Sequence, residues 1–248
     1  MLSSLESRRA ILFDLDGTLV DTAADIGCAL NRMLRELDAP EIPQAVVRTM
    51  IGSGTAVLVD RALAHSGLVV SDRERLGLVR RFLILYADLL DSGATEAEPY
   101  PGAEWALAGL ADTGIPIAVV TNKEQRLAAL VLSTAGLSRY VDLLVGGGAC
   151  SRRKPDPAML LHACAELAVK PGEAVMVGDS VNDIRAARAA RMPVIAATYG
   201  YLGTTDPQSL CCDGYVDRLA ELPGRISVHG ALIAQGVRER MDAGARRF

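Results

Sequence analysis

Five short segments of the chain are apolar at every position, and each is followed by polar turn residues and then by a helical pattern. The segments are Ile11–Phe13, Ile117–Val120, Leu143–Val145, Ala174–Val177 and Val194–Ala197. Uninterrupted apolar runs are typical of strands that are covered on both faces, whereas half-buried strands alternate. The repetition of strand and helix therefore predicts an α/β fold with a doubly wound parallel sheet.

The interval between the first two of these segments is far longer than the others, and its pattern is helical. Apolar residues recur at helical spacing over three stretches: Ala23–Leu37, Thr55–His65 and Arg73–Leu90. Tyr100-Pro101-Gly102 then begins a helix that leads back to the sheet. We therefore expect a catalytic core of residues 8–20 and 96–224 and an all-helical cap, residues 21–95, inserted into it. Residues 225–248 form a tail without an assigned role.

Composition and charge narrow the class of protein. Half of the 248 residues are hydrophobic and the formal net charge is −4, so neither nucleic acid nor an anionic membrane is an expected partner. The first nine residues hold Glu6 and no apolar run, and no apolar stretch is long enough to span a bilayer. The five cysteines form no Cys-x-x-Cys pair, so no disulfide framework or structural zinc is expected. These features favour a cytoplasmic protein. We expect a monomer or a homodimer whose partner is a small molecule.

Two carboxylates follow the first predicted strand directly, in the run Asp14-Leu15-Asp16-Gly17-Thr18. Carboxylates this close repel each other and must be kept solvated or be neutralised, so a structural reason for them is hard to find. A chemical reason is available, because one carboxylate can attack, the other can move a proton, and a divalent cation can balance the charge.

The next two predicted strands lead to groups that suit an anion. Thr121 and Asn122 place a hydroxyl and backbone N–H groups at a strand-to-helix turn, which suits a phosphate oxygen, although they also fit ordinary turn chemistry. Lys154 precedes Pro155 and Pro157, which stiffen the backbone and aim the ammonium group. A lysine near a sheet edge is usually solvated, but here it would bring a positive charge to the carboxylates.

Two further acids, Asp179 and Asp183, follow the fourth predicted strand. A helix N-terminal cap would account for Asp183 but not for Asp179. Together with Asp14 and Asp16 they predict an oxygen-rich pocket that suits Mg²⁺ rather than zinc. If Asp14, Asp179 and Asp183 are ionised, Mg²⁺ and Lys154 balance their charge.

These four elements, in this order, resemble the four motifs of the haloacid dehalogenase superfamily of phosphotransferases. The matching residues are Asp14-Leu15-Asp16-Gly17-Thr18, Thr121-Asn122, Lys154-Pro155 and Gly178-Asp179 with Asp183. The resemblance implies a Rossmann-like core, and the helical insertion resembles the small helical cap of this superfamily. Because the insertion leaves and rejoins the core near Asp14 and Asp16, it is placed to act as a lid over them.

A narrower resemblance, to the bacterial phosphoglycolate phosphatases, covers about residues 8–222. It rests on Ile51–Gly54, Arg61–Leu63, Tyr100–Gly102, Arg152–Pro157, Gly178–Arg188 and Thr198–Tyr201. The chain departs from that pattern in its tail, in the loop after Tyr201, and at Arg191, where a glycine is expected after the helix.

The resemblance to the superfamily implies roles for the site residues. Asp14 would form an aspartyl phosphate, and Asp16 would act as general acid and base. Mg²⁺ would be held by Asp14, the Asp16 backbone carbonyl, Asp179 and Asp183. The phosphoryl oxygens would be bound by Lys154, which also has a catalytic role, by Thr121, and by the amides of Leu15 and Asn122.

The narrower resemblance implies hydrolysis of 2-phosphoglycolate to glycolate and phosphate. The cap is expected to contribute donors to the substrate from the loop Gly52, Ser53 and Gly54, with one basic residue among Arg48, Arg61 and Lys123. For any one of these basic residues, a solvated surface charge is the commoner case. Another small phosphate ester remains an alternative substrate: N-acetylmuramic acid 6-phosphate, a sugar phosphate or a nucleotide. Two other functions also remain open: a phosphomutase resembling β-phosphoglucomutase, and a binding module without catalysis.

Overall fold

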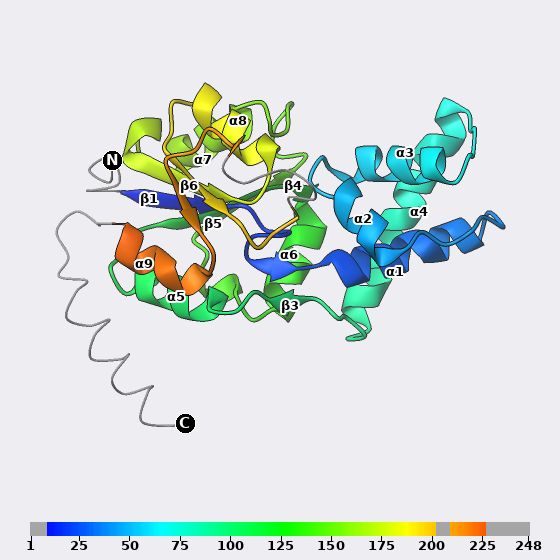
Figure 1. The fold of residues 1–248 in the computed structure, drawn as a ribbon, viewed down its shortest axis with the longest axis horizontal. Helices are drawn as coiled ribbons and strands as arrows, with labels where there is room; N and C mark the ends of the chain where they lie inside the picture. The colour runs from blue at the N-terminus through cyan, green and yellow to red at the C-terminus, as the bar shows by residue number, and fades with distance from the viewer. Residues whose placement is uncertain (1–8, 202–208, 227–248) are drawn as a thin grey trace.

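A computed structural model describes residues 9–201 and 209–226 of the chain. It contains a parallel sheet with the strand order β5-β4-β1-β6-β7-β8 and a separate antiparallel pair, β2-β3. Helices cover the sheet, and the helices α1 to α4 form a group beyond one end of it (Figure 1). The predicted doubly wound α/β fold is confirmed.

The strands are β1 (Ala10–Phe13), β2 (Val20–Asp21), β3 (Glu98–Pro99), β4 (Ile117–Glu124), β5 (Leu143–Gly147), β6 (Ala174–Gly178), β7 (Val194–Ala197) and β8 (Gly214–Val216). The helices are α1 (Ala23–Arg35), α2 (Gln44–Met50), α3 (Thr55–His65), α4 (Asp72–Asp91), α5 (Ala103–Ala111), α6 (Gln125–Thr134), α7 (Ala158–Glu166), α8 (Val181–Ala189) and α9 (Leu222–Arg225). The described residues also include the short 3₁₀ turns η2 (Ser138–Tyr140), η3 (Pro171–Glu173) and η5 (Leu219–Glu221).

The two faces of the sheet explain why its strands are apolar throughout. In β1, Ile11 and Phe13 belong to one apolar cluster and Ala10 and Leu12 to another. Helices α5 and α6 contribute to the first cluster, and α7 and α8 to the second. Since successive strand residues point to opposite faces, a strand covered on both sides must be apolar at each position.

The four helices α1 to α4 lie between β2 and β3, which pair antiparallel and form the two connections to the core. Helix α1 buries Ile26, Leu30 and Met33 on one stripe, and helix α4 begins at the capping box of Ser71 and Glu74. Helix α4 also packs against α6 of the core, so the apolar core continues from the sheet into this group.

Several elements differ from the sequence-based expectations. Helix α1 ends at Arg35, not at Leu37, and α2, β8 and the β2–β3 pair were not expected. Two-residue strands are too short to show an alternation of two, so only their tertiary pairing reveals them. Arg191 has a φ of 55°, the left-handed conformation with which glycine often ends a helix, so the chain keeps this helix end without the glycine.

The two other departures from the phosphoglycolate phosphatase pattern, in the loop after Tyr201 and in the tail, fall largely outside the described residues. Residues 202–208, which follow Tyr201, and residues 227–248 of the tail are not described. In the part of the chain that is described, no helix is long and apolar enough to cross a membrane.

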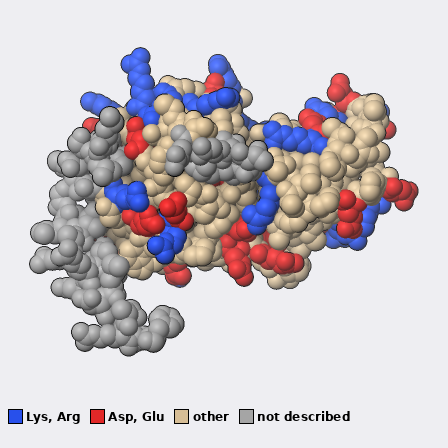
Figure 2. Space-filling view, viewed as in Figure 1, with Lys and Arg blue, Asp and Glu red and all other residues tan. Residues whose placement is uncertain are grey.

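Acidic and basic side chains are interspersed on the face that Figure 2 presents.

Candidate active site

The turn after β1 brings the first two carboxylates to the carboxyl edge of the sheet. The Leu15 carbonyl accepts hydrogen bonds from the amides of Thr18, Leu19 and Val20, which closes a tight turn. Gly17 has a φ of 84° in this turn, and a Cβ placed on it would lie 2.3 Å from the Asp179 carboxylate. Gly17 is therefore required both for the backbone conformation and for the close approach of Asp179.

Asp14 is buried at the centre of the site. Its Oδ1 accepts hydrogen bonds from the Leu15 amide at 2.7 Å and from the Lys154 ammonium at 2.9 Å. Burial, and then repulsion from Asp183, raises the pKa of Asp14 from 3.8 to about 7, although Lys154 acts in the opposite direction. A carboxylate that is costly to ionise in the protein alone calls for additional positive charge.

Lys154 links Asp14 to Asp183. Its ammonium lies 2.9 Å from Asp14 Oδ1 and 2.6 Å from Asp183 Oδ1, and it donates a 2.6 Å hydrogen bond to the Val120 carbonyl. Burial alone would lower the pKa of Lys154, but the two carboxylates raise it above its ordinary value. The ammonium group is therefore a fixed positive charge at the edge of the sheet.

Asp183 caps a helix and also takes part in the cluster of charged groups. Its Oδ2 accepts hydrogen bonds from the Ser180 amide and hydroxyl, which completes a capping box at the start of α8. Its Oδ1 faces Lys154. Gly178 makes room for this arrangement, because a Cβ there would lie 2.4 Å from the Asp183 side chain.

Asp179 is held by two donors and surrounded by negative charge. The Thr18 hydroxyl donates to Oδ1 at 3.0 Å, and the Tyr201 amide donates to Oδ2 at 2.6 Å. Burial raises the pKa of Asp179 well above its ordinary value, and repulsion from Asp14 and Asp183 raises it further.

Asp14, Asp179 and Asp183 form a cluster that fits a metal ion. Each offers a carboxylate oxygen, and these oxygens lie within 4.8 Å of one another. Hard oxygen donors of this kind suit a divalent cation such as Mg²⁺ or Ca²⁺, and such a cation would also offset the mutual repulsion of the acids. The cluster can therefore hold a metal ion.

Asp16 lies beside this cluster, in a different environment. Its Oδ1 accepts hydrogen bonds from the Thr22 hydroxyl at 2.6 Å and from the Lys123 ammonium at 2.9 Å. Lys123, at the end of β4, is buried, and its ammonium lies 4.5 Å from the centre of the Tyr86 ring. Of the three basic residues considered from the sequence, the structure thus brings Lys123 to the carboxylates.

Thr121 and Asn122, also at the end of β4, are both buried. The Asn122 side chain accepts a hydrogen bond from the Lys154 amide and donates to the carbonyls of Lys154 and Gly52. It therefore joins the lysine-bearing loop to a loop of the helical insertion.

The loop of Gly52, Ser53 and Gly54 touches the core chiefly through acceptors. Asn182 at the start of α8 donates to the Gly52 carbonyl at 3.1 Å and to the Ser53 hydroxyl at 3.3 Å. Asn122 shares the same Gly52 carbonyl. Two asparagines of the core thus hold this loop against the site.

A cavity of about 40 Å³ lies between the insertion and the core. Its lining includes Asp14, Asp16 and Lys123 from the core, together with Gly52, Gly54, Thr55 and Tyr86 from the insertion. The cavity is small and partly open to solvent. In this arrangement of the cap, the space beside the carboxylates suits a small ligand.

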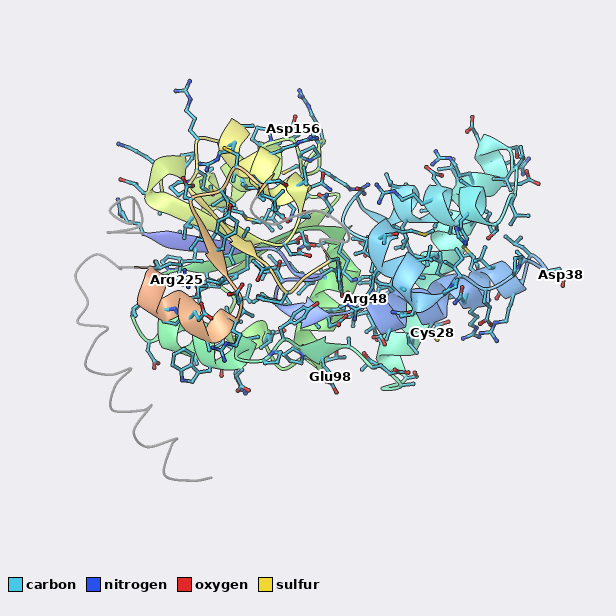
Figure 3. The ribbon with its side chains drawn as sticks, in the orientation of Figure 1. Cys28, Asp38, Arg48, Glu98, Asp156 and Arg225 are labelled. Carbon is cyan, nitrogen blue, oxygen red and sulfur yellow. The ribbon has the colours of Figure 1, made fainter. Side chains whose placement is uncertain are left out.

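Arg48 and Arg61 do not line this cavity. Arg48 forms an ion pair with Asp21 in β2, and its guanidinium lies over the Tyr201 ring at the junction between the insertion and the core (Figure 3). Arg61 donates to the Met50 carbonyl within the insertion. Both arginines contact the structure around the cap rather than the space beside Asp14.

Sequence reasoning did not assign roles to Asn182, Thr18, Tyr201 or Tyr86. Asn182 and Thr18 lie within the matched motifs, and Tyr201 ends a run that matched the narrower family, so their positions carried a signal. Tyr86 belongs to the apolar stripe of α4 and gave no sign of lining a cavity.

Comparison with known proteins agrees with this geometry. The model of the family described as haloacid dehalogenase-like hydrolase matches residues 11–197. A protein of Cupriavidus necator named phosphoglycolate phosphatase, plasmid, is 41% identical over 88% of this chain and 93% of its own length. A phosphoglycolate phosphatase of Nitrosospira multiformis is 38% identical over 86% of this chain and 93% of its own.

A solved structure shows the same fold. The crystal structure of a predicted phosphoglycolate phosphatase from Haemophilus somnus superposes with a TM-score of 0.80 and is 30% identical, covering 87% of this chain and 96% of that one. The family model spans residues 11–197, so the match extends over the first strands, the helical insertion and most of the sheet. This chain belongs to the haloacid dehalogenase-like hydrolase family.

Proposed function

We propose that the protein is a phosphomonoesterase that hydrolyses 2-phosphoglycolate to glycolate and phosphate through an aspartyl-phosphate intermediate. The observation that carries the proposal is the position of Asp14, which is paired with Lys154 beside the acidic cluster and lines a small cavity under the helical insertion. The names of the relatives from Cupriavidus necator and Nitrosospira multiformis support the choice of substrate.

Asp14 is the proposed nucleophile. Its carboxylate attacks phosphorus in line with the ester oxygen, forms the acyl phosphate bond and releases the glycolate oxygen. The bond to the Leu15 amide and the contact with Lys154 hold one oxygen in place and orient the carboxylate for attack.

Asp16 is the proposed general acid and base. It gives a proton to the departing glycolate oxygen and then takes one from the water that cleaves the intermediate. Thr22 and Lys123 both bind its Oδ1, and this fixes the carboxyl group beside the cavity.

Mg²⁺ is the proposed cofactor, held by Asp14, Asp179 and the Asp16 backbone carbonyl, with Asp183 nearby. When bound, it would supply positive charge to the phosphoryl group and to the acids around it. Lys154, Thr121 and the amides of Leu15 and Asn122 are the proposed donors to the phosphoryl oxygens.

The helices α1 to α4 act, in this proposal, as a cap over residues 8–20 and 96–224. The loop held by Asn122 and Asn182 closes one side of the cavity, and helix α4 closes another. A closed cap keeps bulk water away from the acyl phosphate until Asp16 directs one molecule to it.

The size of the cavity favours 2-phosphoglycolate over the larger alternatives. Beyond the phosphoryl group, 2-phosphoglycolate adds a methylene and a carboxylate, whereas N-acetylmuramic acid 6-phosphate and the glucose phosphates add a whole sugar ring. The space beside Asp14 and Asp16 is small, so of these substrates 2-phosphoglycolate needs the least room there.

The proposed function is tested by measuring phosphate release from a panel of esters, with and without Mg²⁺. The panel contains 2-phosphoglycolate, N-acetylmuramic acid 6-phosphate, glucose phosphates and nucleoside monophosphates. We expect Mg²⁺-dependent hydrolysis with a kcat/KM for 2-phosphoglycolate at least about tenfold above the others, which is roughly 1.4 kcal/mol of preference. A flat profile, a different best substrate, or transfer of phosphate back to a sugar would overturn the assignment.

Metal binding is expected to stabilise the protein in a pH-dependent manner. In the metal-free protein Asp14 has a pKa of about 7, against 3.8 for an unperturbed carboxyl group. Its contribution to stability is complete below pH 3.8 and is lost as the pH rises through 7, since the folded site then holds a costly charge. Mg²⁺ competes with protons for this site, so its effect on Tm is expected to be larger at about pH 8 than at about pH 5.5.

Thermal unfolding at matched ionic strength measures this effect. Asp179→Ala removes one proposed ligand, and we expect it to abolish most of the Mg²⁺-dependent rise in Tm. An equal rise at both pH values, or a rise that survives in Asp179→Ala, would contradict the proposed metal site.

A further inference from the structure

The cavity contains a second group of polar atoms, of which the proposed reaction uses only the bond from Lys123 to Asp16. Lys123 and Tyr86 lie together on its wall, Lys123 at the end of β4 and Tyr86 on helix α4 of the insertion. The Lys123 ammonium lies 4.5 Å from the centre of the Tyr86 ring. The two residues approach the cavity from the core and from the cap.

Tyr86 carries a hydroxyl without a partner. The residue is 1% exposed, and its oxygen has no hydrogen-bond partner among the residues that the structure describes. An unpaired buried hydroxyl is unfavourable, so one on a cavity wall is available to bind a ligand. Burial raises the pKa of Tyr86 to about 12, so the hydroxyl keeps its proton and can donate it in a hydrogen bond.

Lys123 supplies the charge for such a ligand. Its ammonium is buried and paired with the Asp16 carboxylate at 2.9 Å, which holds the positive charge at the cavity wall. An ammonium group has three donors, and the bond to Asp16 Oδ1 uses one of them. Among the described residues that line the cavity, Lys123 is the sole lysine or arginine.

The position of this pair fits a carboxylate close to the reacting ester. Asp16, the proposed acid for the ester oxygen, lies 2.9 Å from the Lys123 ammonium. In 2-phosphoglycolate a single methylene separates the ester oxygen from the carboxylate. A substrate whose ester oxygen faces Asp16 therefore brings its carboxylate to Lys123 and Tyr86.

We propose that Lys123 and Tyr86 form the subsite that binds the substrate's carboxylate, Lys123 by its charge and Tyr86 by a hydrogen bond from its hydroxyl. This inference rests on the proposed function and identifies its specificity-determining residues. Because one residue belongs to the core and the other to the cap, the carboxylate joins the two parts. The subsite replaces Arg48 and Arg61, which do not line the cavity.

The test compares 2-phosphoglycolate with its neutral amide, 2-phosphoglycolamide, which has the same heavy-atom shape. The measured quantity is the ratio of kcat/KM for the acid to kcat/KM for the amide, in the full-length protein with Mg²⁺. We expect Tyr86→Phe to lower this ratio at least about tenfold, the usual effect of losing a hydrogen bond to a charged group. Lys123→Met is expected to lower it further, on the order of 100-fold. The ratio is informative even if Lys123→Met also slows turnover in general, because both substrates share the Asp16 step.

Tyr100→Phe is the matched control. Its hydroxyl is also buried without a hydrogen-bond partner among the described residues, but Tyr100 does not line this cavity. The acid-to-amide ratio of Tyr100→Phe should equal that of the wild type. Tyr86→Phe should have a Tm equal to or above that of the wild type, since it removes a buried hydroxyl that has no bond to lose.

The outcomes separate this inference from the proposed function. If the wild-type protein prefers 2-phosphoglycolate and both variants keep the wild-type ratio, the carboxylate is bound elsewhere: the inference is overturned and the function stands. If the wild-type protein prefers another ester, the function is overturned. In that case the acid-to-amide ratio still tests the subsite. A wild-type ratio above one that falls in both variants supports a carboxylate subsite, and a wild-type ratio of one overturns it.

Discussion

Asp14→Asn is expected to abolish turnover while leaving the fold intact. The amide has the size of the carboxylate, and its oxygen can still accept the bond from the Leu15 amide, but it cannot attack phosphorus. Loss of a nucleophile typically lowers kcat by about 10⁴-fold or more. Steady-state phosphate release from 2-phosphoglycolate, with Mg²⁺ present, measures the effect.

The same variant makes an opposite prediction for stability. Burial and Asp183 disfavour the charged form of Asp14, so a neutral amide removes an unfavourable charge from the metal-free protein. At about pH 8 without metal, Asp14→Asn should therefore unfold at the same urea concentration as the wild type or a higher one. Asp88→Asn, at an exposed position of α4, is the matched control and should change neither property. Turnover by Asp14→Asn within tenfold of the wild type would show that Asp14 is not the nucleophile.

Lys154→Met is expected to cost both activity and stability. The variant keeps a long side chain but removes the ammonium that contacts Asp14, Asp183 and the Val120 carbonyl. Removing one partner of a buried ion pair leaves an uncompensated charge and destabilises proteins by about 3–5 kcal/mol. Urea unfolding of the metal-free protein measures this loss.

The pH dependence of that loss identifies its cause. Without Lys154 the pKa of Asp14 should rise above 7, so protonation relieves the repulsion at lower pH. The stability difference from the wild type should therefore shrink between about pH 8 and about pH 5.5. Lys170→Met, at an exposed lysine, should change stability by less than about 0.5 kcal/mol. A difference that does not vary with pH would mean that Lys154 acts through packing rather than through charge.

The sequence was sufficient for the sheet and for the positions of the acids. Each of the five predicted strands is present, because a strand buried on both faces must be apolar throughout. The strands β1, β4, β5 and β6 are followed by the four motifs, and parallel strands bring their carboxyl ends to one edge. The proximity of Asp14, Asp179, Asp183 and Lys154 follows from that rule.

The tertiary structure decided which polar groups meet beyond that edge. Lys123, Arg48 and Arg61 were equivalent candidates in the sequence, since each is basic and no local pattern shows which of them faces the carboxylates. Only the packing of α4 against α6 places Tyr86 beside Lys123, over a separation of 37 positions that no local pattern encodes. Likewise, Asn122 and Asn182 find the Gly52 carbonyl only when the cap is docked on the core.

The physical reason is the range of the interactions involved. Burial and backbone geometry repeat along the chain, so the apolar runs, Gly17 and the acids at the strand ends can be identified from their neighbours in sequence. Hydrogen bonds and ion pairs act over about 3 Å between groups far apart in the chain, and they depend on how helices pack. The sequence by itself therefore determined the sheet and its acidic edge, and the docking of the cap decided the pairing of Lys123 with Asp16 and Tyr86.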